Sequence, residues 1–314
     1  MLSRRASQMF FRSLRLFRKA KKNRKHEVCD ARDTGLGPLE AYYEHNGAPS
    51  LIRVDLSHCR WYGASGISYS RDSPHPYIQT LIEYEEGICT TYDGSFLQKY
   101  WQHWSPKSLA EYFGIDQEEC HPLLLRTPPI HNILPWSPSN RIEYMEQEKW
   151  MSRSDYRELC LAGGTPARSC GPKPDWFGEI RSRRLVSVYE SIKGSGYREM
   201  AAESKPYGDQ HILGNCLVRD GITRFVVANG QHRAAGLSAL GHSAASMIVH
   251  INDGKGPAMV RRDEVGHWPL VGRNIFTPGQ AEAIFDRIFD AAPLPEIESM
   301  KSETSGTHQV LSRS

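Results

Sequence analysis

Long apolar runs and paired cysteines are both missing from this sequence. No stretch of its 314 residues approaches the roughly 18 to 20 apolar residues that a transmembrane helix needs, and none resembles the apolar core of a secretory signal peptide. The seven cysteines are scattered singly, which argues against a disulfide framework and against a zinc ribbon. These absences predict a cytoplasmic globular protein. Hydrophobic residues make up 39% of the sequence, which is enough for one or two packed domains.

The motifs of several enzyme classes are missing as well. No Gly-x-Ser-x-Gly elbow, Walker A loop or Gly-x-Gly-x-x-Gly turn is present at a change from strand to helix. No His-Glu-x-x-His motif or paired histidine spacing is present either, so we assign no metal ligand from the sequence. Serine-hydrolase, P-loop and dinucleotide-binding functions therefore have no support.

Acidic residues are absent from residues 1–26, which carry ten lysine and arginine side chains. The remainder has 29 basic against 36 acidic residues, so the net charge of +3 conceals a basic tail (residues 1–27) and an acidic body. An acidic body does not attract a polyanion over its whole surface. Binding to nucleic acid or to an anionic membrane surface would therefore depend on residues 1–26 or on a local patch.

The basic tail also has an apolar stripe. Ala6, Phe10, Leu14 and Phe17 follow helical spacing, which predicts a basic amphipathic helix over residues 6–20. Such a helix binds anionic lipid weakly and in a salt-dependent way, which would make the protein peripheral at a membrane. The same composition is typical of a disordered tail, of a nucleic-acid-binding arm and of a transit peptide, and all four interpretations stay open.

The rest of the chain divides by composition into four segments. Residues 45–120 predict an α/β region that opens with a strand at Leu51–Leu56. Residues 121–178 form a Pro-rich connecting belt, because eight of the 19 prolines fall between residues 122 and 174. Residues 179–292 have the most regular pattern, and residues 293–314 are polar and Ser-rich, so we expect the last segment to be disordered.

The aromatic residues of the belt fit either of two roles. They could anchor irregular chain to a core, or they could form a platform for a sugar or a base. The residues concerned are Trp136, Tyr144, Trp150 and Trp176.

Helical spacing, β-branched runs and turn residues alternate over residues 179–292. This alternation predicts an α+β fold for the C-terminal half. The expected elements are, in order, a helix over 179–193, a hairpin of strands 212–218 and 223–228 with its turn at Asp220-Gly221, a turn at 229–233, a helix ending at Gly241, a strand over 246–251 and a helix that Thr277 caps and Pro278 starts.

The turn and its flanking elements carry a recognisable signature. A strand is followed by Gly-x-His/Arg-Arg, then by an Ala-rich helix ending in Leu-Gly, then by another strand. The residues that fill it are Gly230, His232, Arg233, Ala234, Ala235, Leu240 and Gly241. Over residues 180–252 the chain thus resembles the N-terminal domain of ParB partition proteins and its relatives, the sulfiredoxins and free-serine kinases. The resemblance implies a ParB/sulfiredoxin-like mixed domain that holds a nucleotide at this turn, as CTP is held in ParB-like domains and ATP in sulfiredoxins.

The turn also has the composition of an anion-binding site. A helix N-terminus presents amide N–H groups at the positive end of its dipole, Gly230 allows close approach, and Arg233 can donate to two phosphate oxygens. We therefore expect Gly230, Gln231, His232 and Arg233 to bind a nucleoside triphosphate or diphosphate with Mg²⁺. We expect Asn229, His232 and Arg233 to act in phosphotransfer to a small polar acceptor or in nucleotide hydrolysis. In the alternative, His232 and Arg233 only cap and brace the hairpin.

The sequence departs from each relative at a defined position. Sulfiredoxins have their catalytic cysteine where this chain has Gln231, and serine-kinase sites have an acid where it has Asn229, which is a poor base. Glu190 or Asp209 could serve as the base instead, and nothing after residue 252 matches the helix-turn-helix region of ParB. Two further hypotheses are a non-catalytic nucleotide- or nucleic-acid-binding regulator tethered by its basic tail, and a structural interaction protein with a degenerate site.

Overall fold

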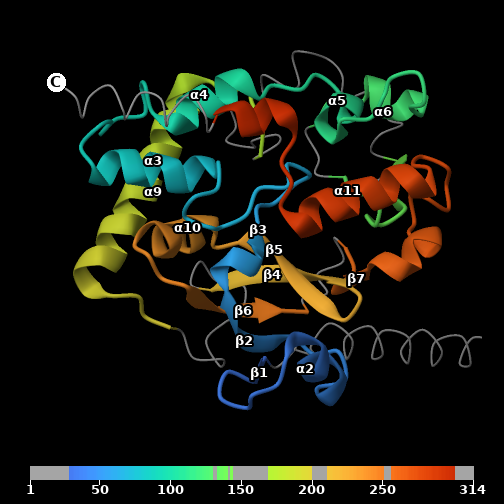
Figure 1. The fold of residues 1–314 in the computed structure, drawn as a ribbon, viewed down its shortest axis with the longest axis horizontal. Coiled ribbons are helices and arrows are strands. Elements are labelled where there is room, and N and C mark those ends of the chain that lie inside the picture. The colour runs from blue at the N-terminus through green and yellow to red at the C-terminus, as the bar shows by residue number, and fades with distance from the viewer. Residues whose placement is uncertain are drawn as a thin grey trace, which may run out of the picture.

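A computed structural model describes residues 28–129, 133–140, 142–143, 169–199, 211–250 and 256–300 (Figure 1). The basic tail, residues 301–314, Tyr144, Trp150 and Asp209 lie outside the described residues. Helices and strands are mixed along the described chain, and the sheet contains both parallel and antiparallel pairs, so the predicted α+β class is confirmed.

In the described part of the chain, seven strands form one mixed sheet in the order β1-β2-β6-β4-β5-β3, with β7 also paired to β4. The strands β2 and β6 pair antiparallel, as do β4 and β5, and the other pairs are parallel. The bounds are β1 (Cys29–Asp30), β2 (Ser50–Asp55), β3 (Cys59–Arg60), β4 (Ile212–Arg219), β5 (Ile222–Asn229), β6 (Ala244–Val249) and β7 (Met259–Arg261).

The hairpin of β4 and β5 confirms the sequence prediction. Its turn residues Asp220 and Gly221 both have positive φ angles, 51° and 75°. Two positive φ values are what a tight type I′ turn requires, which explains why Asp-Gly stands at this point. The strand predicted at Leu51–Leu56 is also present, as β2.

The N-terminal and C-terminal regions share this sheet. The strand β2 pairs with β6 along its length, and β3 pairs with β5. Residues 45–120 and 179–292 are therefore joined through one sheet. A strand must pair its backbone N–H and C=O groups, and the partner it finds is not encoded in its own pattern.

The larger helices lie on one side of the sheet, whereas α2 lies beside β1 and β2 (Figure 1). Thr277 caps α11 by accepting a hydrogen bond from the Gln280 amide, and Gln280 reciprocates, which is the start that we predicted. The helix bounds are α2 (Pro38–Glu44), α3 (Pro76–Glu85), α4 (Phe96–His103), α5 (Leu109–Phe113), α6 (Pro122–Arg126), α9 (Asp175–Ser195), α10 (Gln231–Ala239) and α11 (Pro278–Asp290), with short 3₁₀ helices η1 (Leu56–His58) and η3 (Arg262–His267).

Nearly all of the largest fully buried side chains of the core are aromatic. From the belt, Trp136 is buried against Trp268 and Phe285, with ring centroids 5.1 and 5.9 Å away, so it is an anchor of irregular chain. Trp176, in contrast, is 39% exposed on α9.

The expected disorder after residue 293 does not apply to residues 295–300, which are helical. Leu294, Ile297 and Met300 are buried in the main core, and their spacing of three residues places them on one side of this short helix. The residues between these three positions are mostly polar, so the composition of the segment did not indicate an apolar stripe. Within the described residues, no helix is both long and apolar enough to cross a membrane.

Candidate functional site

The predicted turn joins β5 to α10 and packs against the start of β4. Gly230 has a φ of 76°, in the left-handed region that favours glycine. A Cβ atom on Gly230 would lie 2.8 Å from the Ile212 Cα and 2.9 Å from the His211 carbonyl oxygen. Glycine is therefore required both for the backbone conformation and for the close contact with β4.

Side chains of the turn hold its backbone in place. The Asn229 Oδ1 accepts a hydrogen bond from the Gly230 amide at 2.9 Å. The amides of Arg233 and Ala234 both donate to the Gly230 carbonyl, at 3.0 Å. The amides of Gln231 and His232 thus precede the first intrahelical hydrogen bond and lie at the positive end of the α10 dipole.

Arg233 is half-buried beside the turn. Its guanidinium donates to the His211 carbonyl at 3.2 Å, which ties the side chain to the start of β4. Burial raises the pKa of Tyr197, and the nearby positive charge of Arg233 acts in the opposite direction. A guanidinium has five N–H donors in a planar fork, and the bond to the His211 carbonyl positions the fork of Arg233 beside the turn.

The His232 ring lies in the interface with α3. It stacks on the Tyr77 ring with centroids 5.0 Å apart and an interplanar angle of 19°. Packing against Tyr77 accounts for the position of the His232 ring. This agrees with the alternative in which His232 braces the hairpin. At the turn itself, His232 presents its backbone amide.

Sequence reasoning missed a group of charged residues near Tyr197. The Glu199 carboxylate accepts hydrogen bonds from Arg32 at 3.3 Å and from Arg53 at 3.2 Å, and its negative charge acts on Tyr197. Arg53 on β2 pairs across the sheet with Ser246 on β6. Glu199 is separated from the two arginines by 167 and 146 residues, so no local pattern could have indicated this group.

Of the two carboxylates considered as bases, Glu190 alone lies within the described residues. Its side chain is exposed on α9 near Tyr84 of α3, whereas Asp209 lies outside the described residues. Among the described residues, no group of three or more His, Cys, Asp or Glu side chains could hold a metal ion. The turn consequently supplies hydrogen-bond donors and one positive charge.

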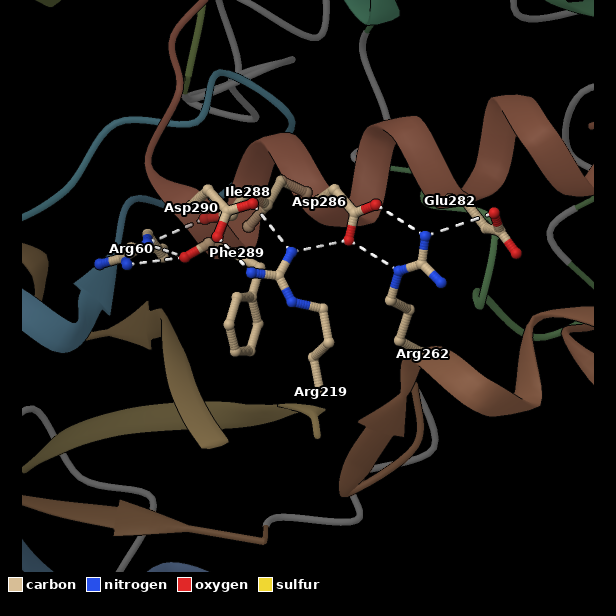
Figure 2. A network of polar contacts seen from close by, with 8 residues as sticks. All are labelled: Arg60, Arg219, Arg262, Glu282, Asp286, Ile288, Phe289 and Asp290. Atoms are coloured by element: carbon tan, nitrogen blue, oxygen red, sulfur yellow. Dashed lines mark hydrogen bonds and ion pairs between the residues drawn. The ribbon is translucent and has the colours of Figure 1, made fainter. Parts of the chain in front are cut away.

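Two clefts elsewhere in the molecule are not lined by the turn. The smaller, of about 300 Å³, lies between β4 and η3. Arg219 and Arg262 line it and both donate to Asp286, at 2.8 to 2.9 Å (Figure 2). Arg219 also binds Asp290, and Arg262 also binds Glu282.

The same network extends to the C-terminal end of α11. The buried Arg60 donates to the carbonyls of Ile288 and Phe289 at 2.7 to 3.1 Å (Figure 2), and to the carbonyls of Ser57 and Cys59. Burial lowers the pKa of Arg60 to about 10. We call Arg60, Arg219, Arg262, Glu282, Asp286 and Asp290 the arginine network. Arg219 and Arg262 form ion pairs with acidic side chains of α11, and Arg60 donates to carbonyls at the end of α11, which indicates that the network fastens this helix to the sheet.

Comparison with known proteins adds no assignment, because no family model, no curated protein and no solved structure matches this chain.

Proposed function

We propose that this protein binds the phosphate groups of a nucleotide at the turn Gly230–Arg233, within a ParB/sulfiredoxin-like domain of its C-terminal half. The observation that carries the proposal is the close packing of the backbone at Gly230. Gly230 has a left-handed backbone conformation, and there is no room for a Cβ atom at this position. The first turn of α10 can therefore lie directly against β4. The order β4, β5, α10 and β6 supports the resemblance to that family.

Each residue of the turn has a proposed role toward the phosphates. The amides of Gln231 and His232 donate to phosphate oxygens, as the first amides of a helix commonly do. Arg233 adds a forked, charge-assisted contact, and Gly230 permits the close approach. Asn229 uses its Oδ1 on the Gly230 amide, which leaves its Nδ2 group to orient the ligand.

The proposed ligand is a nucleoside triphosphate or diphosphate. Mg²⁺ would enter with it, because the described residues contain no acidic or histidine cluster suited to a metal ion. A bound triphosphate supplies a transferable phosphoryl group, and the reaction we propose is transfer to a small polar acceptor or hydrolysis. Arg233 would stabilise the negative charge that develops on the phosphates.

Calorimetric titration with ATP, ADP, CTP and GTP in the presence of Mg²⁺ tests the proposal on the full chain. Arg233→Ala should weaken nucleotide binding about tenfold or more, because a hydrogen-bonded charge is removed. Arg233→Lys should retain part of the affinity, since lysine keeps the charge and loses the fork. Arg273→Ala, which changes an exposed arginine after η3, should bind as the wild type does.

Circular dichroism of each variant must first show an intact fold, since Arg233 also contacts the His211 carbonyl. Equal affinity in the wild type and in Arg233→Ala would contradict the proposed site. Failure of all four nucleotides to bind any of these proteins would favour a structural interaction protein.

The second candidate is a nucleotide- or nucleic-acid-binding regulator without catalysis. The separation of charge between residues 1–26 and the acidic remainder favours it. Binding to DNA, RNA or anionic vesicles should then weaken steeply with salt and disappear when residues 1–26 are deleted. Nucleotide binding at the turn should survive the deletion, which separates the two candidates.

A further inference from the structure

A larger cleft, of about 540 Å³, lies between the start of α9 and the loop that precedes α4. We call it the acidic cleft. Its polar lining includes Tyr92, Asp93, Asp175, Glu179, Ser182 and Arg183. Three carboxylates therefore face one guanidinium, in a volume typical of small-molecule sites.

The helix α9 supplies one wall of the acidic cleft. Because α9 begins at Asp175, the residues Asp175, Glu179, Ser182 and Arg183 follow one another at helical spacing along the same face. Gly178 lies between them, and a Cβ atom on it would be 1.9 Å from the Tyr92 Cζ. The missing side chain thus allows the phenol end of Tyr92 to press against α9.

The loop that supplies the other wall is held by its own hydrogen bonds. The Cys89 thiol donates to the carbonyls of Thr91 and Asp93, both at 3.3 Å. The Ser95 hydroxyl donates to the Tyr92 carbonyl at 2.6 Å and caps α4. The loop is therefore shaped before any ligand arrives, which lowers the entropic cost of binding.

Polar groups inside the cleft are left unused by the protein. Tyr92 and Ser182 line it and are each 6% exposed, and neither hydroxyl has a hydrogen bond within the described residues. Asp93, Asp175 and Glu179 likewise make no ion pair there. Burial and the nearby Asp175 charge raise the pKa of Tyr92 to about 12, so its hydroxyl stays protonated at neutral pH.

We propose that the acidic cleft binds a small organic cation, whose ammonium or guanidinium group lies among Asp93, Asp175 and Glu179. Such a group offers several N–H donors, which suit three carboxylates and the hydroxyl oxygens of Tyr92 and Ser182. Arg183 carries the opposite charge on the same wall and orients a ligand that also has an acceptor group. This site is independent of nucleotide binding at the turn.

Titration of the full chain with putrescine and with agmatine, at low ionic strength, tests the proposal, because exposed carboxylates are screened by salt. Glu179→Gln should raise the dissociation constant of putrescine about fivefold, as expected for one partly exposed ion pair. Tyr92→Phe should raise it about two- to threefold through loss of one hydrogen bond. Glu118→Gln, an exposed glutamate outside the cleft, is the matched control and should change nothing.

The bis(trimethylammonium) analogue of putrescine has the same two charges and the same four-carbon spacing but no N–H donor, and it should bind clearly more weakly than putrescine. Equal binding of the two cations, or equal loss in Glu179→Gln and Glu118→Gln, would mean general charge attraction and would overturn the proposal. Binding that appears only after residues 1–26 are deleted would make the basic tail the occupant, and would also overturn it.

Discussion

The arginine network at α11 and the acidic cleft at α9 are built from the same residue types. In the arginine network, Arg219 and Arg262 share Asp286, and Arg60 donates to carbonyls at the end of α11. In the acidic cleft, Asp175 and Glu179 make no ion pair within the described residues. Charged side chains of the same types thus hold α11 to the sheet in one region and line a preformed cleft in the other.

Solvent exposure explains this difference. The side chains of Arg219, Arg262 and Asp286 are only 26–32% exposed, and Arg60 is 4% exposed. A charge removed from water needs a partner, or it destabilises the fold. The carboxylates of the acidic cleft are exposed, so water solvates them at little cost until a ligand replaces it. The comparison predicts that substitutions in the two regions will affect different measurements.

The largest effect is expected for Arg60→Met, which keeps much of the side-chain volume but removes every donor. The carbonyls of Ile288 and Phe289 would lose their partners, so we expect a loss of about 3 to 5 kcal/mol in the free energy of unfolding. Urea denaturation measures it. Arg273→Met serves as the exposed control, and an equal small effect in both variants would show that the network does not hold α11.

A smaller loss is expected for Asp286→Asn. Asp286 accepts hydrogen bonds from both Arg219 and Arg262, so the free energy of unfolding of the variant should be lower by about 1.5 to 3 kcal/mol. The control is Asp263→Asn, whose carboxylate is 70% exposed beside Arg261 and should leave stability unchanged. Similar denaturation midpoints for the two variants would argue against the role of burial given above.

The same carboxylate predicts a pH dependence. The hydrogen bond from Arg262 is the main cause that lowers the pKa of Asp286 below its ordinary 3.8. Its contribution to stability is therefore complete above that value and is lost as the pH falls through the lower folded pKa. Urea midpoints of the wild type and of Asp286→Asn should converge as the pH falls below 3.8. A constant difference at all pH values would contradict this titration.

The smallest effect on stability is expected in the acidic cleft. Glu179→Gln should change the free energy of unfolding by less than about 0.5 kcal/mol, because the carboxylate has no partner in the protein to lose. Thermal unfolding without added cation measures this. If Glu179→Gln destabilises the chain as much as Asp286→Asn does, both regions are structural and the contrast between them fails.

Several local features of the fold could be predicted from the sequence. The hairpin with its Asp-Gly turn was predicted, and so was the Thr277 cap. Each of these features depends on residues only a few positions apart. Boundaries were less accurate. The helix α9 begins at Asp175 rather than at Glu179, because the Pro-rich context hid its first turn.

The candidate turn was identified from its composition, but its geometry was not. Gly230 and Arg233 could be named because a glycine and an arginine at a helix start suit an anion. That His232 stacks on Tyr77, and that Arg32 and Arg53 share Glu199 near Tyr197, depends on residues far apart in the chain. Spacing within the turn carries no information about these partners.

Local chemistry therefore specified the hairpin, the caps and the glycine turn, because a turn or a helix end is stabilised by hydrogen bonds among near neighbours. The pairing of β2 with β6, the arginine network and the contact of Tyr92 with Gly178 depend instead on how the whole core packs. Such contacts join residues that are close only after folding. They gain their energy from burial and from mutual desolvation, which a local pattern of residues does not record.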